Sequence, residues 1–221
     1  MRRLAQPEVL KLATIAALGT ALLSGPRLVL WSNRPSPIWY LEAIVFLGSL
    51  VLWAFVFAWH EHYTGKPVFT LNIQSGLISS TTLAGLGMAV LLVLFVDPSM
   101  RARTPADYPD SYDQWIAMTL FSLVFVQLFL VVAPFAWLVR LIRNQRVAIF
   151  LTVCLGVIVL MFKTRSSPTP VPLELFAALF VARITLGFLS VFFYLRGGLL
   201  LMWWWGFLLQ ARHLVHLIGA Q

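Results

Sequence analysis

Residues 38–59 read IWYLEAIVFLGSLVLWAFVFAW, an apolar run whose one charged side chain is Glu42. The run covers 22 positions, and a helix needs about 20 mostly apolar residues to cross the hydrocarbon core of a bilayer. Trp39, Tyr40 and Trp59 stand near its two ends, where amphipathic aromatic rings favour the membrane–water interface. The run therefore predicts a transmembrane helix.

Apolar runs of similar character fill most of the remaining chain. Gly-Pro-Arg at 25–27 interrupts the first of them, and the run at 147–162 has 16 residues, short enough to tilt or to cross incompletely. Gly197 and Gly198 predict a tight turn between the last two runs. The sequence thus predicts an all-α fold, a polytopic membrane helix bundle of six to seven transmembrane helices in one integral membrane domain, 1–221. The expected spans are 12–30, 38–59, 75–96, 115–139, 147–162, 173–195 and 199–218.

Composition places the chain in the same class. It is 60% hydrophobic and 11% charged, whereas soluble domains carry about 25% charged residues. This excludes a soluble enzyme, a disordered chain and a secreted disulfide scaffold. Cys154 is the one cysteine, which excludes an intrachain disulfide and a metal site built from several thiolates. A polar loop at 97–113 and a stiff proline-rich connector at 166–172 are too short for a second domain.

The net charge of +8 comes from basic residues that stand singly or in small groups between apolar runs. That pattern favours anionic lipid headgroups as partners, because nucleic acid binding needs a concentrated basic patch. We expect the lipid bilayer and a membrane protein as partners, no nucleic acid, and a multi-pass location in the bacterial cytoplasmic (inner) membrane. With the N-terminus inside and seven spans, eight basic residues fall inside and seven outside, so loop charge sets no orientation.

Arg183 lies near the middle of the run at 173–195, where inserting an arginine costs about 2.5–3.5 kcal/mol. Its guanidinium must face the bundle interior, water or a carboxylate. Glu174 lies nine residues earlier, on the opposite face of the same helix, so we expect Glu42 as the partner of Arg183. A tie to backbone carbonyls and snorkelling to the interface are the alternatives.

Four histidines occur as two pairs, His60 with His62 after the second run and His213 with His216 in the last. The spacing i, i+3 places the second pair on one face of a helix, which suits a metal or a haem edge. All four are weak metal candidates, because the first pair is also explained as loop residues at the headgroup level and the second as polar residues near a helix end. If every span crosses, the pairs lie on opposite sides of the membrane. The sequence therefore assigns no metal ligand, no catalytic residue and no cofactor.

Two further patterns concern helix packing. Thr81 and Gly85 form a small-xxx-small step, which allows two helices to approach closely. Trp203, Trp204 and Trp205 project around most of a helix, so at least one of them faces lipid. We interpret these indoles as interfacial anchors; stacking on a pigment or quinone is the alternative.

A Leu-Gly step at 186–187 is followed by YLRGG at 194–198 and then by a tryptophan-containing run, and residues 132–135 read VAPF. Over about 114–218 these features resemble the tail and the motif lead-in of the CPBP family, the intramembrane proteases related to the type II CAAX prenyl endopeptidase. The resemblance implies a helical membrane protease scaffold.

The catalytic positions of that family are not matched here. Its first motif is a Glu-Glu pair followed by an arginine, and the corresponding residues 135–140 read FAWLVR. Its second motif needs a histidine, which 147–162 lacks, and His213 comes about two turns after the position near 206–207 where its third histidine is expected. A metal-activated water needs such ligands and a carboxylate base.

The sequence therefore favours a non-catalytic membrane protein that binds a partner protein or a lipid. The first alternative is an active intramembrane metal-dependent hydrolase with a rearranged site, in which the four histidines act with Glu42 or Glu61. The second is an accessory subunit of a membrane redox or pigment complex, in which histidine and tryptophan side chains contact a cofactor.

Overall fold

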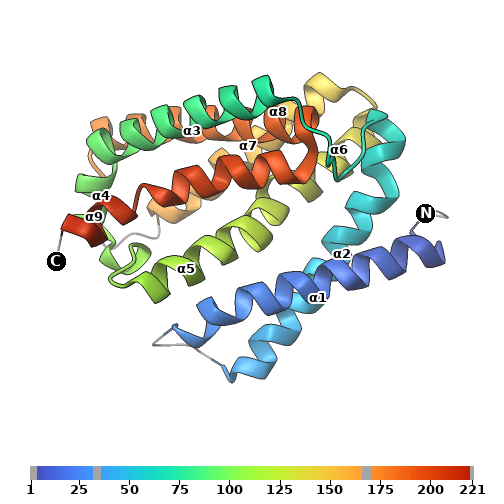
Figure 1. Ribbon diagram of the computed structural model, residues 1–221, viewed down its shortest axis with the longest axis horizontal. Helices are drawn as coiled ribbons and strands as arrows, with labels where there is room; N and C mark the ends of the chain where they lie inside the picture. Colours follow the sequence, from blue (N-terminus) through green and yellow to red (C-terminus); the bar gives the residue numbers. More distant parts are fainter. Residues whose placement is uncertain (1–3, 32–35, 166–170, 220–221) are drawn as a thin grey trace. The chain divides into compact units, whose positions relative to one another are not determined.

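The computed structural model describes residues 4–31, 36–165 and 171–219, and every named element within these ranges is a helix (Figure 1). The protein is an all-α, multi-pass membrane helix bundle, as its sequence predicts. Positions 166–170 of the predicted proline-rich connector lie outside the described residues. Within these described ranges, six helical segments are long and apolar enough to cross a membrane: α1 (Pro7–Val29), α2 (Ile38–Thr64), α3 (Ser75–Phe95), Tyr112–Ile142, α7 (Gln145–Arg165) and Leu173–Gly219.

α2 extends five residues beyond the predicted end at Trp59. Gly65 ends it in the left-handed conformation (φ 66°), where its N–H bonds to the Glu61 carbonyl at 2.9 Å. A glycine that closes a helix in this way marks the end better than the change to polar residues does. His60 and His62 consequently lie in the last turns of the helix, and the interpretation of the two as loop residues is wrong.

α7 and α1 also differ from their predicted lengths. α7 has 21 residues, a rise of about 30 Å, because its polar end residues join the apolar run in the helix. The predicted shortness of this span is therefore wrong. α1 continues through Gly25-Pro26-Arg27 to Val29. Proline removes one backbone donor there, while Ser24, Gly25 and Leu28 are buried and hold the turn in place.

The fourth span is assembled from four consecutive helical pieces. Ser111 caps its start, its Oγ accepting from the N–H of Gln114 at 3.3 Å. The middle of the span is widened by two π-helical stretches that meet at Gln127, a feature often found at functional positions. The pieces are α5 (Tyr112–Phe121), η2 (Ser122–Val126), η3 (Leu128–Val132) and α6 (Ala133–Ile142).

α8 (Leu173–Ala211) is bent back on itself at the predicted glycine turn. Gly197 (φ −136°, ψ 16°) and Gly198 (φ 67°, ψ −164°) leave the helical conformation and divide it into a first arm, 173–196, and a second arm, 199–211. The second arm rises about 20 Å, and the short helix α9 (Leu214–Gly219) follows it. The last two predicted spans are thus two arms of one element.

The chain divides into two compact units, of which unit 1 comprises 1–68 and 111–148 and unit 2 comprises 69–110 and 149–221. α7 begins in unit 1 and continues in unit 2. The sequence predicts one domain, which would require the two units to pack against each other. This stays a prediction.

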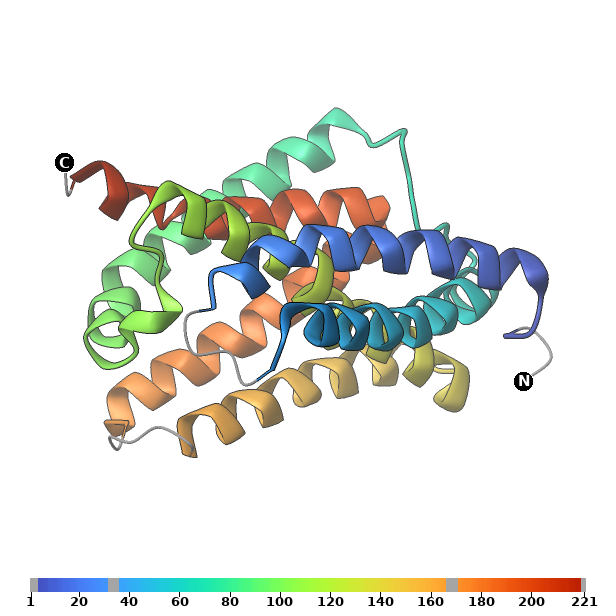
Figure 2. The ribbon, with the colours of Figure 1, turned by 90° about the horizontal axis from the view of Figure 1, so that it is seen from below.

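Unit 1 is built around α2. α1 packs along α2 (Figures 1 and 2), α6 also packs on α2, and α5 contacts α1. A buried hydrogen bond from Nε1 of Trp53 to Oγ1 of Thr20 (2.9 Å) joins α2 to α1. Nearer the start of α1, Val9 packs with Ala58 and Trp59. This last contact places the beginning of α1 beside the end of α2.

Unit 2 is built from α3, α7 and the two arms of α8, and Figure 2 shows α7 beside the first arm. The predicted packing role of the Thr81–Gly85 step is confirmed, because a Cβ added to Gly85 would lie 2.7 Å from Cδ1 of Leu208 in the second arm. Trp205 is fully buried and donates to Oγ of Ser190, whereas Trp204 is 39% exposed. The core residues are Leu92, Val96, Phe193, Leu201, Trp205 and Leu209.

Candidate functional site

Asp97 is a buried carboxylate at the point where α3 ends and α4 (Asp97–Arg103) begins. Its side chain is 1% exposed. Oδ1 accepts a hydrogen bond from the Tyr108 hydroxyl and Oδ2 accepts one from Nε of Arg212, both at 3.0 Å. Burying a carboxylate without such donors would be costly. These two side chains therefore allow Asp97 to occupy an interior position.

The local sequence brings the three residues together through a tight reversal of the chain. Pro98 occupies the first turn of α4, where its missing N–H is not needed. A short 3₁₀ helix, η1 (Pro105–Asp107), then turns the chain so that Tyr108 follows within reach of Asp97. Arg212 enters from the end of the second arm of α8, where its Nη1 also donates to the Leu209 carbonyl. The cluster thus fastens the C-terminal end of α8 to the end of α3.

His213 and Arg101 complete what we call the Asp97 cluster, which consists of Asp97, Arg101, Tyr108, Arg212 and His213. The imidazole ring of His213 stands edge-on to the Tyr108 ring, with centroids 5.3 Å apart, and the Arg101 guanidinium lies 5.3 Å from the same ring. His213 is 6% exposed, and its Nδ1 makes no hydrogen bond to any described residue.

Burial raises the pKa of the Tyr108 hydroxyl well above its ordinary value, and the Asp97 carboxylate beside it acts in the same direction. Each effect disfavours the phenolate, which would carry a second negative charge into the same buried place. Tyr108 therefore remains a hydrogen-bond donor at neutral pH. It does not serve as a base there.

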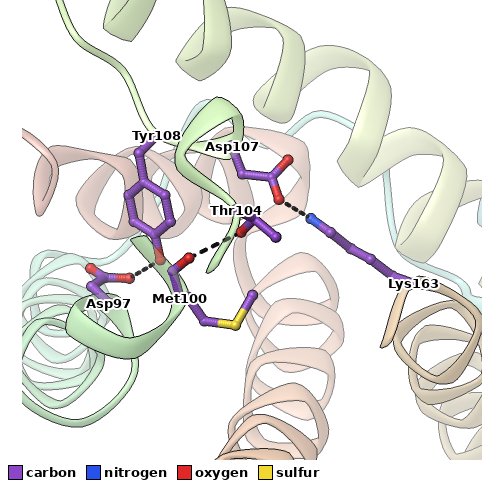
Figure 3. A network of polar contacts seen from close by, with 6 residues as sticks. All are labelled: Asp97, Met100, Thr104, Asp107, Tyr108 and Lys163. Atoms are coloured by element: carbon purple, nitrogen blue, oxygen red, sulfur yellow. Dashed lines mark hydrogen bonds and ion pairs between the residues drawn. The ribbon is translucent and has the colours of Figure 1, made fainter. Parts of the chain in front are cut away.

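A second ion pair lies at the edge of the cluster, as Figure 3 shows. Nζ of Lys163, near the end of α7, contacts Oδ2 of Asp107 at 2.7 Å, and both side chains are about half exposed. Oγ1 of Thr104 donates to the Met100 carbonyl at 3.1 Å and closes the turn between α4 and η1. An exposed pair of this kind stabilises a fold little, so its effect is to position the loop.

Chemically, the Asp97 cluster resembles a structural clasp more than a reaction centre. Each oxygen of its carboxylate already accepts a bond, one donor is a permanently charged guanidinium, and the phenol stays protonated. Within the described ranges, no three side chains of His, Cys, Asp or Glu come together as metal ligands would.

The histidines that the sequence singled out lie in different surroundings. His60 is fully buried in unit 1, with its ring 6.0 Å from that of Phe135, whereas His62 is exposed and lies against Tyr63. In unit 2, His213 stands in the turn before α9 and His216 lies inside α9. The i, i+3 spacing of the second pair therefore does not run along one continuous helix.

Arg183 lies between α7 and the first arm of α8, and its polar partner there is backbone. Nε of Arg183 donates to the Gly156 carbonyl at 3.1 Å. The approach depends on glycine, because a Cβ at position 156 would lie 2.8 Å from the same nitrogen. This contact is the backbone alternative that the sequence leaves open.

Glu42, the predicted partner of Arg183, belongs to unit 1. Its Oε1 lies 3.4 Å from the place that a Cβ on Gly25 would occupy, so the carboxylate rests against the end of α1. The Arg183–Glu42 pair joins residues of different units and stays a prediction.

Two residues of the stretch 135–140, which the sequence compares with the first motif of the CPBP family, lie in the interior of unit 1. Phe135 and Ala136 are both fully buried on α6. The Arg140 guanidinium lies 4.1 Å from the centroid of the Trp59 ring, in a cation–π contact. These side chains are the apolar packing that joins α6 to α2.

Sequence reasoning missed four members of the Asp97 cluster, namely Asp97, Arg101, Tyr108 and Arg212. Asp97, Arg101 and Tyr108 fall in the predicted polar loop at 97–113, and the pairing of Asp97 with Arg212 bridges 115 positions of the chain. One signal was present: Asp97 follows an apolar run directly and Arg212 adjoins His213, so a charge of each sign marks a helix end. Which two ends meet is decided by tertiary packing.

Comparison with known proteins gives no further relation: no family model matches the chain, and no curated protein or solved structure matches it.

Proposed function

We propose that this chain is a non-catalytic integral membrane protein that binds another transmembrane helix through Arg183. In this proposal it is a degenerate CPBP-like scaffold of the bacterial cytoplasmic membrane, as the sequence suggests. The partner is recognised by its chemistry, an acidic side chain at mid-membrane depth.

The observation that carries the proposal is the incomplete pairing of Arg183. The side chain stands ten residues into α8 and opposite the middle of α7, far from either helix end. Nε bonds to the Gly156 carbonyl, but no described carboxylate pairs with the guanidinium. A charged residue at this depth is costly unless a partner compensates it, which is why such residues mark functional sites.

The geometry of the guanidinium favours a carboxylate as the partner. Because Nε is directed at a backbone carbonyl, the two terminal nitrogens are left to donate as a fork, which matches the two oxygens of one carboxylate. Lipid phosphates lie at the headgroup level, about 15 Å from the centre of the bilayer. A carboxylate on a transmembrane helix can reach the required depth.

Support for binding over catalysis comes from the acidic and aromatic residues. Asp97 is the buried carboxylate of the described residues, and Tyr108 and Arg212 already engage it. Phe135 and Ala136 pack where the resemblance would require paired glutamates.

The proposal is tested with synthetic transmembrane peptides in lipid vesicles that contain the purified full-length protein. One peptide carries a single central Glu in a Leu/Ala helix, and its matched control carries Gln. Binding is measured by energy transfer between labels on peptide and protein. We expect the Glu peptide to bind about fivefold more tightly than the Gln peptide, the size of an interhelical hydrogen bond in membranes.

Three variants separate the charge at position 183 from general effects. Arg183→Gln should abolish the preference for the Glu peptide, and Arg183→Lys should retain part of it. Arg196→Gln, which removes an exposed charge at the end of the same arm, should leave the preference unchanged. Equal binding of the two peptides to the unmodified protein would refute the proposal, as would a preference that survives Arg183→Gln.

A further inference from the structure

The turn between α6 and α7 presents two exposed arginines on a rigid base. Arg143 closes α6 in the left-handed conformation (φ 55°), which is uncommon for a residue with a side chain. Oδ1 of Asn144 then caps α7, accepting from the N–H groups of Arg146 (3.0 Å) and Val147 (3.3 Å). The amides at the start of α7 are thereby occupied, so the side chains of Arg143 and Arg146 carry the charge that this turn offers.

Aromatic contacts place this turn at the level of the lipid headgroups. Trp137, 44% exposed, precedes Arg140 by one helical turn on α6. Arg140 itself lies over the ring of Trp59, which packs against Val9. An exposed tryptophan one helical turn before an arginine, close to the end of a helix, is typical of a membrane–water interface. The start of α1, the end of α2 and the α6–α7 turn thus form one end of unit 1.

This end of unit 1 is predominantly basic. Its acidic residues are Glu8 and Glu61, and neither forms a described ion pair. Of the described residues, Arg27, Glu42 and Asp113 carry the charges of the opposite end of unit 1. Among the residues that the structure describes, the basic ones of the first end are Lys11, Lys66, Arg140, Arg143 and Arg146.

We infer that the α6–α7 turn binds the phosphate group of anionic phospholipids, with Arg143 and Arg146 as the contacting side chains. Arginine donates to phosphate oxygens in pairs, and a negatively charged membrane surface attracts each nearby basic residue. A free phosphate ion offers the same group, so the test must separate the two sources. The inference does not rest on the function proposed for Arg183.

The test uses the full-length protein in zwitterionic detergent micelles. Its thermal unfolding is followed while short-chain phosphatidylglycerol is added, and parallel titrations use short-chain phosphatidylcholine and inorganic phosphate. Arg143→Gln/Arg146→Gln removes two exposed charges at the start of α7. Arg165→Gln/Arg196→Gln removes two exposed charges elsewhere in the chain and is the matched control. Arg143→Lys/Arg146→Lys keeps the charge but not the paired donors.

We expect phosphatidylglycerol to raise the melting temperature of the unmodified protein and phosphatidylcholine to leave it unchanged. In Arg143→Gln/Arg146→Gln the phosphatidylglycerol concentration needed for half the effect should rise about tenfold or more. The lysine variant should fall between the two, and the control should behave as the unmodified protein does. If both glutamine variants needed equally more phosphatidylglycerol, the response would depend on net charge alone. That result would overturn the inference. An equal response to inorganic phosphate would replace the lipid site by a free-phosphate site.

Discussion

At the scale of single residues, the carboxylate of Asp97 is fully compensated by donors within the chain, whereas the guanidinium of Arg183 is compensated only in part. Asp97 takes one hydrogen bond on each oxygen, and Arg183 reaches a carbonyl that glycine leaves accessible. Removing one member of a buried ion pair typically costs about 3–5 kcal/mol, because its partner is left uncompensated. The Asp97 cluster is therefore where small changes of side chain should have the largest effects on stability.

Tyr108→Phe removes the hydroxyl donor from Asp97 and keeps the ring. At pH 7 to 9 we expect it to lower the free energy of unfolding by about 1–2 kcal/mol, since the bond is to a charged acceptor. The raised pKa of Tyr108 adds a pH dependence. Above about pH 10 an unfolded tyrosine ionises while the folded one does not, so the unmodified protein loses stability that the variant does not lose.

The measurement is unfolding of both proteins in micelles from pH 7 to 11. The difference between the two free energies should be constant up to about pH 9 and then shrink. If the difference between the two unfolding free energies grew with pH, the pKa of Tyr108 would be lowered by folding and not raised. Asp97→Asn should cost more than Tyr108→Phe at pH 7, because it leaves Arg212 without its ion-pair partner.

At the scale of elements, close approach of helices depends on a few glycines. Gly85→Ala places a Cβ 2.9 Å from Cβ of Leu208, which a change of rotamer cannot relieve. α3 and the second arm of α8 must separate, and we expect a loss of about 1–3 kcal/mol in unfolding free energy. Gly87→Ala on the same helix meets nothing within 4 Å and should be neutral within about 0.5 kcal/mol. Similar effects of the two changes would contradict the packing described here.

The turn between the arms of α8 depends on Gly198. Its φ of 67° with ψ of −164° lies in a region that is nearly exclusive to glycine. Gly198→Ala should therefore lower the unfolding free energy by about 1–3 kcal/mol, measured in the same micelles. Gly48→Ala, at a helical position with nothing within 4 Å, is the control. A Gly198→Ala protein as stable as its parent would mean that the turn has another conformation.

The existence of the spans could be read from the sequence, but several of their ends could not. Apolar runs define where a helix is buried in lipid, whereas α2 ends where Gly65 adopts a left-handed conformation, five residues later. His60 shows the consequence, since a position taken for a headgroup-level loop is fully buried beside Phe135. The pairing of Asp97 with Arg212 could not be predicted from the sequence, because no local pattern specifies which helix ends meet.

At the scale of the whole molecule, the second arm of α8 determines on which side the chain ends. Phe69 pairs with Gly198 near the start of α3, and Arg212 contacts Asp97 at its end. The second arm therefore runs alongside α3, and we expect it to cross the membrane together with α9. With seven crossings, the segment after α2 and the segment that holds α9 lie on opposite sides.

Labelling with a membrane-impermeant maleimide tests this topology. In a Cys154→Ala background, single cysteines are placed at Tyr63 and at Val215, which is 61% exposed. We expect the two cysteines to react from opposite sides of the membrane, one in intact cells and the other only in inside-out vesicles. Reaction of both from the same side would contradict the seven crossings.

The central claim is that Arg183 is held ready for a carboxylate from another helix. Glu42 is the alternative partner of Arg183 within the chain. The most direct measurement therefore compares the Glu42→Gln variant with the unmodified protein. In the same vesicles, it determines how much more tightly each protein binds the Glu peptide than the Gln peptide. The account predicts a preference of about fivefold in both proteins. A preference that is absent from the unmodified protein and emerges only in Glu42→Gln would contradict it, and would identify Arg183 as an internal tie to Glu42.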